Sequence, residues 1–163
     1  MYRLDCLPLE GRTGHQTGRL LLERMFRAQF HREMPEIAIA PGGKPYFPGE
    51  SVYFSISHTP RHAFCALSDR PVGIDAEEQD RAIRLSLAEK ILSPSEYQRF
   101  SRSDDPRVCL LRLWVLKEAL VKSTGEGLRG YPNFTDFSPE DPRIRLLEGC
   151  FVAVIQKEDA HAL

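Results

Sequence analysis

Hydrophobic and polar residues alternate along several short stretches of the chain, which is the pattern of a β-strand with one buried face. The clearest stretch has Val52, Phe54 and Ile56 alternating with Tyr53 and Ser55. Similar stretches, bounded by turn residues, predict further strands. The predicted strands cover residues 3–9, 37–39, 52–56, 63–67, 72–76, 133–137, 143–147 and 150–155.

Other stretches carry hydrophobic residues three and four positions apart, which predicts amphipathic helices. Pro35 is expected to end the first of them. Ser93, Pro94 and Glu96 combine an N-cap, a proline in the first turn and a capping glutamate, so they mark a helix start. The predicted helices cover residues 13–34, 82–91, a segment that follows Ser93, and 108–123, the last closed by Gly125 and Gly127. Together these elements predict an α+β fold.

A length of 163 residues suits one ordinary domain or two small halves that share a core. The turn Ser68–Pro71 lies between two predicted strands near the middle of the pattern. We therefore expect any division at this turn, with one half over residues 1–70 and the other over residues 71–163.

Composition and charge narrow the classes of protein to consider. With 42% hydrophobic and 28% charged residues, the chain has the composition of a soluble globular protein. The net charge of -1 gives no reason to expect nucleic-acid binding by bulk electrostatics. Apolar runs such as residues 151–155 are far shorter than a membrane span, and we expect no secretory signal.

The four cysteines, Cys6, Cys65, Cys109 and Cys150, are widely separated in the sequence. Zinc sites and reactive dithiols need close spacing, for example two cysteines with two residues between them. We therefore expect buried, reduced cysteines, which are typical of a cytoplasmic protein.

Two carboxylates, Asp75 and Glu77, lie two positions apart on a predicted strand. Side chains at this spacing point to the same face of a strand, so the two acids are presented together. Hard oxygen ligands of this kind suit Mg²⁺, which usually shares oxygens with substrate phosphates. The competing interpretation is a pair of exposed acids at a strand end, and for an isolated pair that interpretation is the commoner one.

The predicted helix over residues 108–123 carries Glu118 and Lys122 four positions apart, hence on one face. Such a pair is commonly a solvated salt bridge. Here the helix is apolar on most sides, so it is expected to be buried, and charges within it need partners. A metal ion for Glu118 and a phosphate for Lys122 would supply them.

Two shorter segments complete the candidate chemistry. Ser57 and His58 follow a strand and could bind phosphate oxygens, although a polar turn is the simpler interpretation. A Ser-His hydrolase fits poorly, because neighbouring strand residues face opposite ways and no Gly-x-Ser-x-Gly elbow is present. Lys44 follows two glycines and precedes Pro45, so its backbone path is constrained, although alone it would be a surface turn.

The order of these segments is more specific than any one of them. Gly-Lys-Pro at 43–45, Ile-Ser-His at 56–58, Gly-Ile-Asp-x-Glu at 73–77 and Trp-x-x-Lys-Glu-Ala-x-x-Lys at 114–122 follow one another along the chain. This series resembles the 4′-phosphopantetheinyl transferase superfamily, and especially its surfactin-synthetase-activating type. The similarity runs from about residue 42 to residue 128. It implies a pseudo-dimer of two similar α+β halves with coenzyme A in the cleft between them.

The resemblance also implies roles for the residues. Asp75 and Glu118, with Glu77 as a third ligand, would hold Mg²⁺ on the coenzyme A pyrophosphate, and Lys122 would neutralise charge on the leaving phosphate. A serine hydroxyl of an apo acyl or peptidyl carrier protein would attack the β-phosphate, and 3′,5′-adenosine bisphosphate would leave. Whether Glu118 or a water takes the serine proton stays open, because a metal-bound carboxylate is a poor base.

The remaining implications concern coenzyme A and the carrier. Ser57 and His58 would contact the coenzyme phosphates, and Lys44 would hold the nucleotide end. The segment around Glu96 and Tyr97 would lie near the carrier. A monomer is expected, since two halves in one chain already form the cleft.

The N-terminal half departs from the family pattern because it is short. Related chains hold the 3′-phosphate with basic residues at the start of the first helix. Here only Arg12, His15 and Arg19 are available, and a solvated helix face explains them equally well.

Two other classes of function stay open. A non-catalytic module could bind coenzyme A or a carrier, although binding alone does not need Asp75, Glu118 and Lys122 together. A Mg²⁺-dependent phosphohydrolase could use the same acids and would break down coenzyme A without a carrier.

Overall fold

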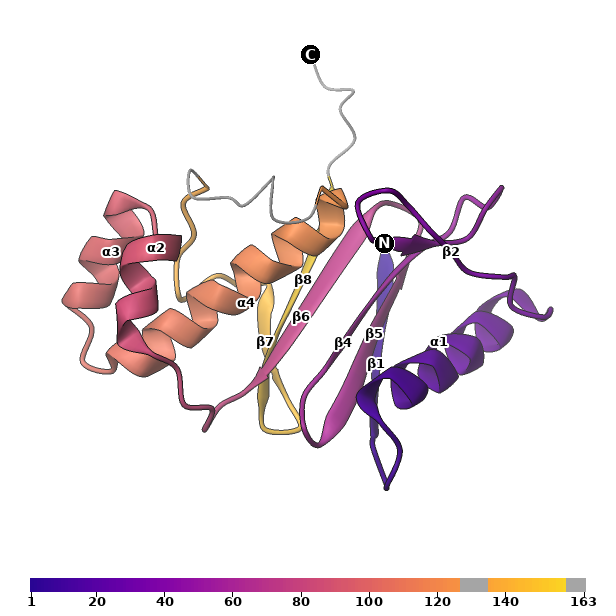
Figure 1. The fold of residues 1–163 in the computed structure, drawn as a ribbon, viewed down its shortest axis with the longest axis horizontal. Coiled ribbons are helices and arrows are strands. Elements are labelled where there is room, and N and C mark those ends of the chain that lie inside the picture. The colour runs from indigo at the N-terminus through magenta and orange to yellow at the C-terminus, as the bar shows by residue number, and fades with distance from the viewer. Residues whose placement is uncertain (127–134, 158–163) are drawn as a thin grey trace, which may run out of the picture.

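A computed structural model of the chain describes residues 1–126 and 135–157. It contains two three-stranded antiparallel sheets, each covered by a long helix (Figure 1). The first part comprises β1 (Tyr2–Pro8), α1 (Gly14–Phe30), β2 (Ala38–Ile39), β3 (Pro45–Tyr46), β4 (Tyr53–His58) and β5 (His62–Ser68). The second comprises β6 (Val72–Glu78), a 3-10 turn (Leu85–Leu87), α2 (Ala88–Ile91), α3 (Pro94–Ser101), α4 (Pro106–Thr124), β7 (Ile144–Leu147) and β8 (Cys150–Gln156).

The two sheets have the same connectivity. The strand order is β1-β5-β4 in one sheet and β6-β8-β7 in the other, so in each the last strand pairs with the first and lies in the middle. A long helix precedes the second strand of each sheet, α1 in one case and α4 in the other. The small β2-β3 ribbon is an addition to the first part.

Serine side chains join the two sheets where β4 and β6 run side by side in the same direction. The Ser55 hydroxyl accepts a hydrogen bond from the Ile74 amide at 3.1 Å, and the Ser57 hydroxyl accepts one from the Ala76 amide at 3.2 Å. These bonds satisfy backbone donors that would otherwise lack partners in a buried position. They also fix the register of β6 on β4.

The core has three layers of side chains. One cluster packs α1 against the first sheet, and a second packs α4 and the shorter helices against β8. The third lies between the sheets and includes Phe64, Ile74 and Val152. β5 and β8 are therefore hydrophobic on both faces, which explains why their sequences read as continuous apolar runs.

Helix termini agree with the sequence where capping residues were identified. Ser93 and Glu96 form the predicted capping box at the start of α3. α1 begins with a second capping box, from Thr13, but ends at Phe30 rather than at 34 as predicted. His31 adopts a left-handed conformation with φ 52° and ends the helix before Pro35 is reached.

Three further predictions need correction. The helix expected over 82–91 is helical only from Leu85: residues 82–84 have no regular secondary structure, and Arg84 has an extended backbone. The strand expected over 133–137 falls partly outside the described residues, and residues 135–137 form no strand. α4 starts at Pro106, two residues earlier than expected, because the Asp105 side chain accepts a hydrogen bond from the Val108 amide.

Two other expectations concerned reduced cysteines and membrane-spanning segments. All four cysteines are free, and three are buried, while Cys6 is partly exposed. Among the described helices, none is both long enough and apolar enough to cross a membrane.

A carboxylate, Asp136, fastens the segment after residue 134 to α3. Its Oδ1 accepts a hydrogen bond from the Ser93 hydroxyl at 2.8 Å, and its Oδ2 pairs with the Arg99 guanidinium at 3.1 Å. The Ser95 hydroxyl donates to it as well. These donors, with Ser95 and Arg99 contributing most, lower the pKa of Asp136 to about 2.

Asp136→Asn is expected to lower the free energy of unfolding at pH 7 by about 1 kcal/mol, since exposed ion pairs contribute little more. Because the pKa is depressed, this stabilisation is complete above a pH of about 4, the ordinary carboxyl value. It is lost as the pH falls through about 2. Thermal melts from pH 7 to pH 3 should therefore show a difference in Tm that shrinks with acid. A difference independent of pH would contradict this assignment.

Candidate active site

Asp75 is the most buried acid of the candidate site, with 6% of its surface exposed. Its Oδ1 accepts hydrogen bonds from the Lys122 ammonium at 2.7 Å and from the Ser57 hydroxyl at 3.2 Å. Its Oδ2 is buried and has no hydrogen-bond partner among the described residues. Burial raises the pKa of Asp75, and the two donors oppose that rise. A buried oxygen without a partner is costly unless a further ligand satisfies it.

Glu77 lies on the same face of β6, as its spacing from Asp75 predicts. Its Oε1 accepts a hydrogen bond from the indole of Trp114 at 3.2 Å and forms an ion pair with Arg81. Its pKa is raised by burial first and by the nearby charge of Asp75 second. Two carboxylates thus share one small region of low solvent access.

Glu118 and Lys122 reach this region from α4. Burial raises the pKa of Glu118, and the charges of Asp75 and Glu77 raise it further, which shows that the three acids interact. α4 comes this close because β6 has a glycine at the crossing: a Cβ on Gly73 would lie 1.9 Å from the Ala119 carbonyl oxygen. The glycine that precedes the two acids is therefore a packing requirement.

The chemistry of these residues fits a hard divalent cation. The described residues contain no group of three His, Cys, Asp or Glu side chains gathered closely enough to hold a metal by themselves. Mg²⁺ does not require one, because it commonly takes one or two carboxylates together with waters and substrate phosphates. The observation that favours such an ion is the buried, unpartnered Oδ2 of Asp75, and the raised pKa of Glu118, caused by burial first and then by the charge of Asp75, agrees with it.

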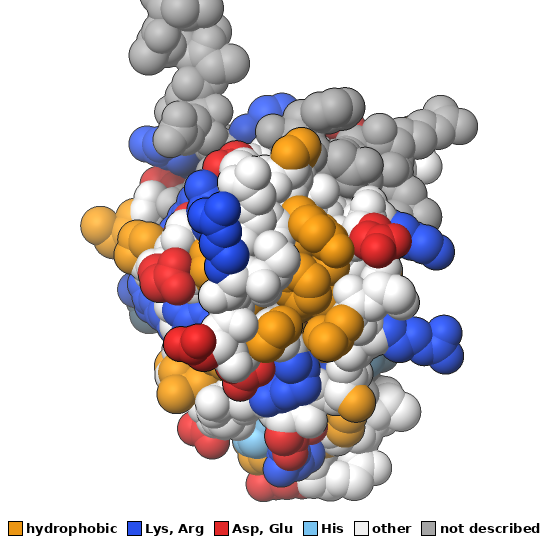
Figure 2. Space-filling view, turned by 90° about the vertical axis from the view of Figure 1, so that its left-hand side faces the viewer, with side chains coloured by type: hydrophobic (Ala, Val, Ile, Leu, Met, Phe, Trp, Pro, Cys, Tyr) orange, Lys and Arg blue, Asp and Glu red, His pale blue; other side chains and the backbone are white. Residues whose placement is uncertain are grey.

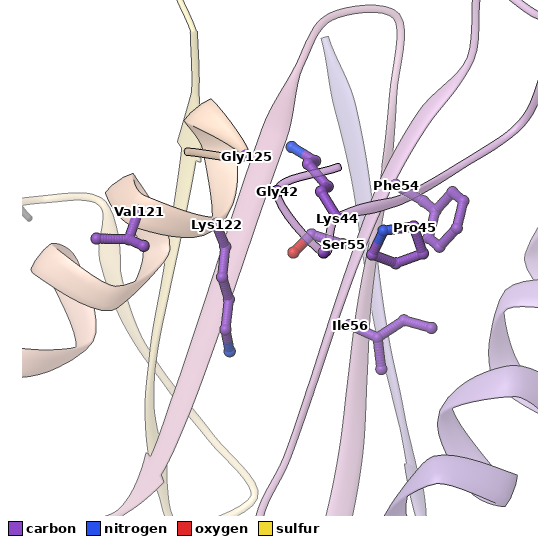
Figure 3. A pocket seen from close by; sticks show the side chains of 10 residues that line it. Gly42, Lys44, Pro45, Phe54, Ser55, Ile56, Val121, Lys122 and Gly125 are labelled. Atoms are coloured by element: carbon purple, nitrogen blue, oxygen red, sulfur yellow. The ribbon is translucent and has the colours of Figure 1, made fainter. Parts of the chain in front are cut away.

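A cavity of about 280 Å³ lies beside Lys122, between the end of α4 and strands β3 and β4 (Figure 3). Its walls come from the loop before β3, from β4 and from the last turns of α4, so both parts of the fold contribute. It is lined by Gly42, Gly43, Lys44, Pro45, Phe54, Ser55, Ile56, Val121, Lys122 and Gly125. A largely apolar cavity with two lysines in its lining, Lys44 and Lys122, suits a ligand that carries both an apolar part and an anionic group.

The ammonium of Lys44 is not directed at a ligand site alone. It donates hydrogen bonds to the backbone carbonyls of Val72 and Ser123, both at 3.0 Å. Burial lowers its pKa to about 8, and Lys157 contributes to the shift. Sequence reasoning expected a residue that holds the nucleotide end, and the structure adds these contacts within the protein.

Ser57 and His58 occupy different places although they are neighbours. The Ser57 hydroxyl lies in the seam between the sheets and within 3.4 Å of the Lys122 ammonium. His58 is exposed at the strand end, and its ring contacts the start of α1: a Cβ on Gly14 would lie 2.3 Å from it. The structure therefore brings Ser57 to the acids and His58 to the first helix.

The basic residues at the start of α1 are all exposed. Arg12 pairs with Glu10 at 3.3 Å, and His15 lies in the first helical turn next to the position that contacts His58. Arg19 lies more than a turn further along the helix. Arg12, His15 and His58 thus surround one helix start, while Arg19 is more remote.

Comparisons with known proteins agree with the motif series. A profile of the 4′-phosphopantetheinyl transferase superfamily matches residues 71–156, more than half of the chain. The chain belongs to this superfamily. All three acids and Lys122 lie within the matched residues.

Curated relatives extend the match into the first half. The chain is 31% identical over 121 residues to the 4′-phosphopantetheinyl transferase Sfp of Bacillus subtilis, covering 70% of this chain and 54% of that protein. It is 33% identical over 135 residues to the 4′-phosphopantetheinyl transferase psf-1 of Bacillus pumilus, covering 79% of this chain and 58% of the relative. The chain thus spans little more than half the length of these superfamily members.

Sequence reasoning missed one charged residue of the candidate site. Arg81 pairs with Glu77 and also lowers the pKa of Glu118 by its charge. The available signal was its position four residues after Glu77, but this segment was expected to precede a helix. The role of the Trp114 indole as a donor to Glu77 was also missed, since the residue was considered only as part of a motif.

Proposed function

We propose that the chain catalyses the Mg²⁺-dependent transfer of the 4′-phosphopantetheine arm of coenzyme A to a serine of an apo acyl or peptidyl carrier protein. The observation that carries the proposal is Asp75, whose Oδ1 is bound to Lys122 and whose Oδ2 has no partner among the described residues. Membership of the superfamily and the names of its relatives support the same chemistry.

Asp75 and Glu118 would hold the metal ion, with Glu77 as a third ligand. When bound, Mg²⁺ would offset the charge of the pyrophosphate and polarise the phosphorus under attack. The Trp114 indole and Arg81 would keep Glu77 oriented toward the other acids. This group of donors suits an ion that is completed by substrate phosphates.

Lys122 would stabilise the leaving group. The carrier serine oxygen forms a bond to the β-phosphorus, the bond from that phosphorus to the bridging oxygen breaks, and 3′,5′-adenosine bisphosphate departs. Lys122 is half-buried, and its ammonium lies next to the acids, so it can offset the charge that develops on the departing phosphate. The serine proton would pass to Glu118, whose pKa is raised, or to a water.

Coenzyme A would lie between the two halves, residues 1–70 and 71–163. The cavity beside Lys122 would take the apolar part of the molecule, with Lys44 near the nucleotide end and Ser57 near the phosphates. His58, Arg12 and His15 would hold the 3′-phosphate at the start of α1, with Arg19 less directly involved. We further propose that the protein acts as a cytoplasmic monomer.

The carrier would approach from the end of the molecule that contains α2 and α3. Figure 2 shows hydrophobic side chains between charged ones on this end. Tyr97, with 38% of its surface exposed, and Leu85, with 46%, are large exposed hydrophobic residues of this region. Glu96, which the resemblance places near the carrier, is itself fully buried, so Tyr97 is the exposed residue of that pair.

The test is to incubate the protein with coenzyme A, Mg²⁺ and a panel of apo-carrier proteins and to measure carrier masses. A mass gain of one phosphopantetheine arm that disappears with chelator is the expected result. Trp114 is the only tryptophan and is bonded to Glu77, so its fluorescence should change when Mg²⁺ and coenzyme A bind. Binding without transfer would favour the non-catalytic module, and coenzyme A breakdown without carrier modification would favour the hydrolase.

A further inference from the structure

The side chain of Lys44 crosses from the first half of the fold to the second. Its ammonium donates to the carbonyl of Val72, the first residue of β6, and to the carbonyl of Ser123, in the last turn of α4. One charged group thus joins three elements: the loop before β3, β6 and α4. Figure 3 shows Lys44 next to the end of α4 and Lys122 extending from that helix.

The end of α4 is built to receive this side chain. The last carbonyls of a helix have no donors within the helix, and a positive charge there is favourable. α4 ends at Gly125, which has φ +73°, and a Cβ on this glycine would lie 3.2 Å from the Lys44 side chain. A Cβ on Gly42 would lie 2.0 Å from the Gly125 carbonyl oxygen. Both glycines therefore allow the loop of Lys44 to reach the helix end.

Lys44 also belongs to the seam between β4 and β6. Along this edge of β6, the Lys44 ammonium donates a hydrogen bond to the Val72 carbonyl. The hydroxyls of Ser55 and Ser57 accept hydrogen bonds from the amides of Ile74 and Ala76. Side chains of the first half thus replace the backbone hydrogen bonds that a neighbouring strand would make. Two of these three side chains also reach α4: Ser57 accepts a hydrogen bond from the Lys122 side chain, whereas Lys44 binds the backbone at the end of that helix.

β6 and α4 are the elements that carry the proposed chemistry. Asp75 lies on β6 and Lys122 on α4, and the hydrogen bond between them measures 2.7 Å. We propose that Lys44 is a positioning residue for transfer, because its ammonium holds the end of α4 against β6 and so keeps Lys122 and Glu118 in place relative to Asp75. This inference rests on the proposed function for its effect on catalysis, but not for the clamp itself.

The clamp differs from the nucleotide-binding role that the family resemblance implies for Lys44. A lysine ammonium has three hydrogens, and two of them are directed at protein carbonyls here. With a pKa lowered to about 8, the group is still mainly charged at pH 7. A residue that positions α4 should affect the rate of turnover, whereas a residue that binds the nucleotide should affect coenzyme A affinity.

The discriminating variant is Lys44→Met, which keeps the length of the side chain and removes its donors. We expect kcat to fall about 10- to 100-fold, since small displacements of catalytic groups have effects of this size. The KM for coenzyme A and the Kd for 3′,5′-adenosine bisphosphate should change less than about 3-fold, because the Lys44 ammonium is bound to protein carbonyls rather than to the nucleotide. Lys44→Arg, which can still donate to both carbonyls, should recover much of kcat.

The matched control is Lys157→Met, the same change at an exposed lysine whose charge reaches Lys44. It should leave kcat within about 2-fold, as expected for a surface substitution. A large rise in the Kd for 3′,5′-adenosine bisphosphate with unchanged kcat in Lys44→Met would overturn the proposal in favour of direct nucleotide binding. If Lys44→Met does not fold, Lys44→Gln, which keeps one donor group, replaces it in the same comparison.

Hydrogen exchange separates the clamp from the activity. In Lys44→Met the amides of the last turn of α4 should exchange about 10-fold faster than in Lys157→Met, because the helix end loses its tertiary anchor. If the unchanged protein modifies no carrier, the proposed function fails, and this comparison still tests the clamp. Equal exchange in the two variants would overturn the clamp even if transfer is observed.

Discussion

Asp75→Asn is expected to lower the rate of phosphopantetheine transfer by about 1,000-fold or more while the protein stays folded. The substitution keeps the size of the side chain but replaces a carboxylate with a neutral amide, so the proposed anionic metal ligand and the charge partner of Lys122 are both lost. Positioned electrostatic groups in water-poor sites commonly contribute losses of this order.

Stability should respond differently from activity in this variant. Burial raises the pKa of Asp75, so keeping it ionised at pH 7 is a cost to the folded state. Removing this buried charge offsets the loss of the ion pair with Lys122. The Lys122 side chain is 34% exposed, so water can solvate its ammonium in the variant. We expect the free energy of unfolding to change by about 1 kcal/mol or less. We expect Mg²⁺ with coenzyme A to raise the Tm of the unchanged protein and not that of Asp75→Asn.

The control for Asp75→Asn is Glu78→Gln, an isosteric change of the same kind on the same strand. Glu78 is partly buried and pairs with Arg61 at 2.8 Å, and as the next residue of the strand it faces the opposite way from Glu77. The transfer rate of Glu78→Gln should stay within about 3-fold of the unchanged protein, because no residue of the proposed site is altered. Equal losses in the two variants, or full activity in Asp75→Asn, would contradict the role assigned to Asp75.

Local sequence signals predicted most of the secondary structure. The alternation from Val52 to Ile56 placed β4, and the capping residues Ser93 and Glu96 placed the start of α3. Such signals succeed because each depends on residues close in sequence. The end of α1 was misplaced because His31 ends the helix in a left-handed conformation. A histidine at that position does not by itself predict this conformation.

The candidate site was only partly predictable. Spacing on a strand placed Asp75 and Glu77 on one face, and spacing on a helix did the same for Glu118 and Lys122. The pairing of strand with helix depends on Gly73, whose missing side chain admits α4. Other contacts that hold the site together, such as the hydrogen bond from Lys44 to the Ser123 carbonyl, join positions far apart in the sequence. No local sequence pattern predicts such contacts.

A buried ion pair between Lys117 and Glu96 joins α4 to α3. Lys117 Nζ lies 2.8 Å from Glu96 Oε2, and both side chains have 0% exposure. Glu96 also accepts hydrogen bonds from the Ser93 and Phe137 amides, and Lys117 donates to the Thr135 carbonyl. The pair thus joins α3, α4 and the segment that follows residue 134. Sequence reasoning assigned Lys117 to the motif of α4 but could not identify its partner.

Lys117→Met should destabilise the protein by about 3 to 5 kcal/mol, because it leaves the carboxylate of Glu96 buried without its counter-charge. For a chain of this size, that loss corresponds to a fall in Tm of roughly 10 °C. Urea unfolding measures the change directly. Lys90→Met, the same substitution at an exposed lysine of α2, should change the free energy of unfolding by less than about 0.5 kcal/mol.

A double variant distinguishes the ion pair from simple packing. Lys117→Met with Glu96→Gln removes both charges, and the glutamine amide can still accept one of the two backbone hydrogen bonds that Glu96 receives. The double variant should therefore be more stable than Lys117→Met alone, since no unpaired charge stays buried. The comparison also needs Glu96→Gln alone. If the stability losses of Lys117→Met and Glu96→Gln simply add in the double variant, the two charges do not stabilise each other. Lys117 would then stabilise α4 through its apolar stem.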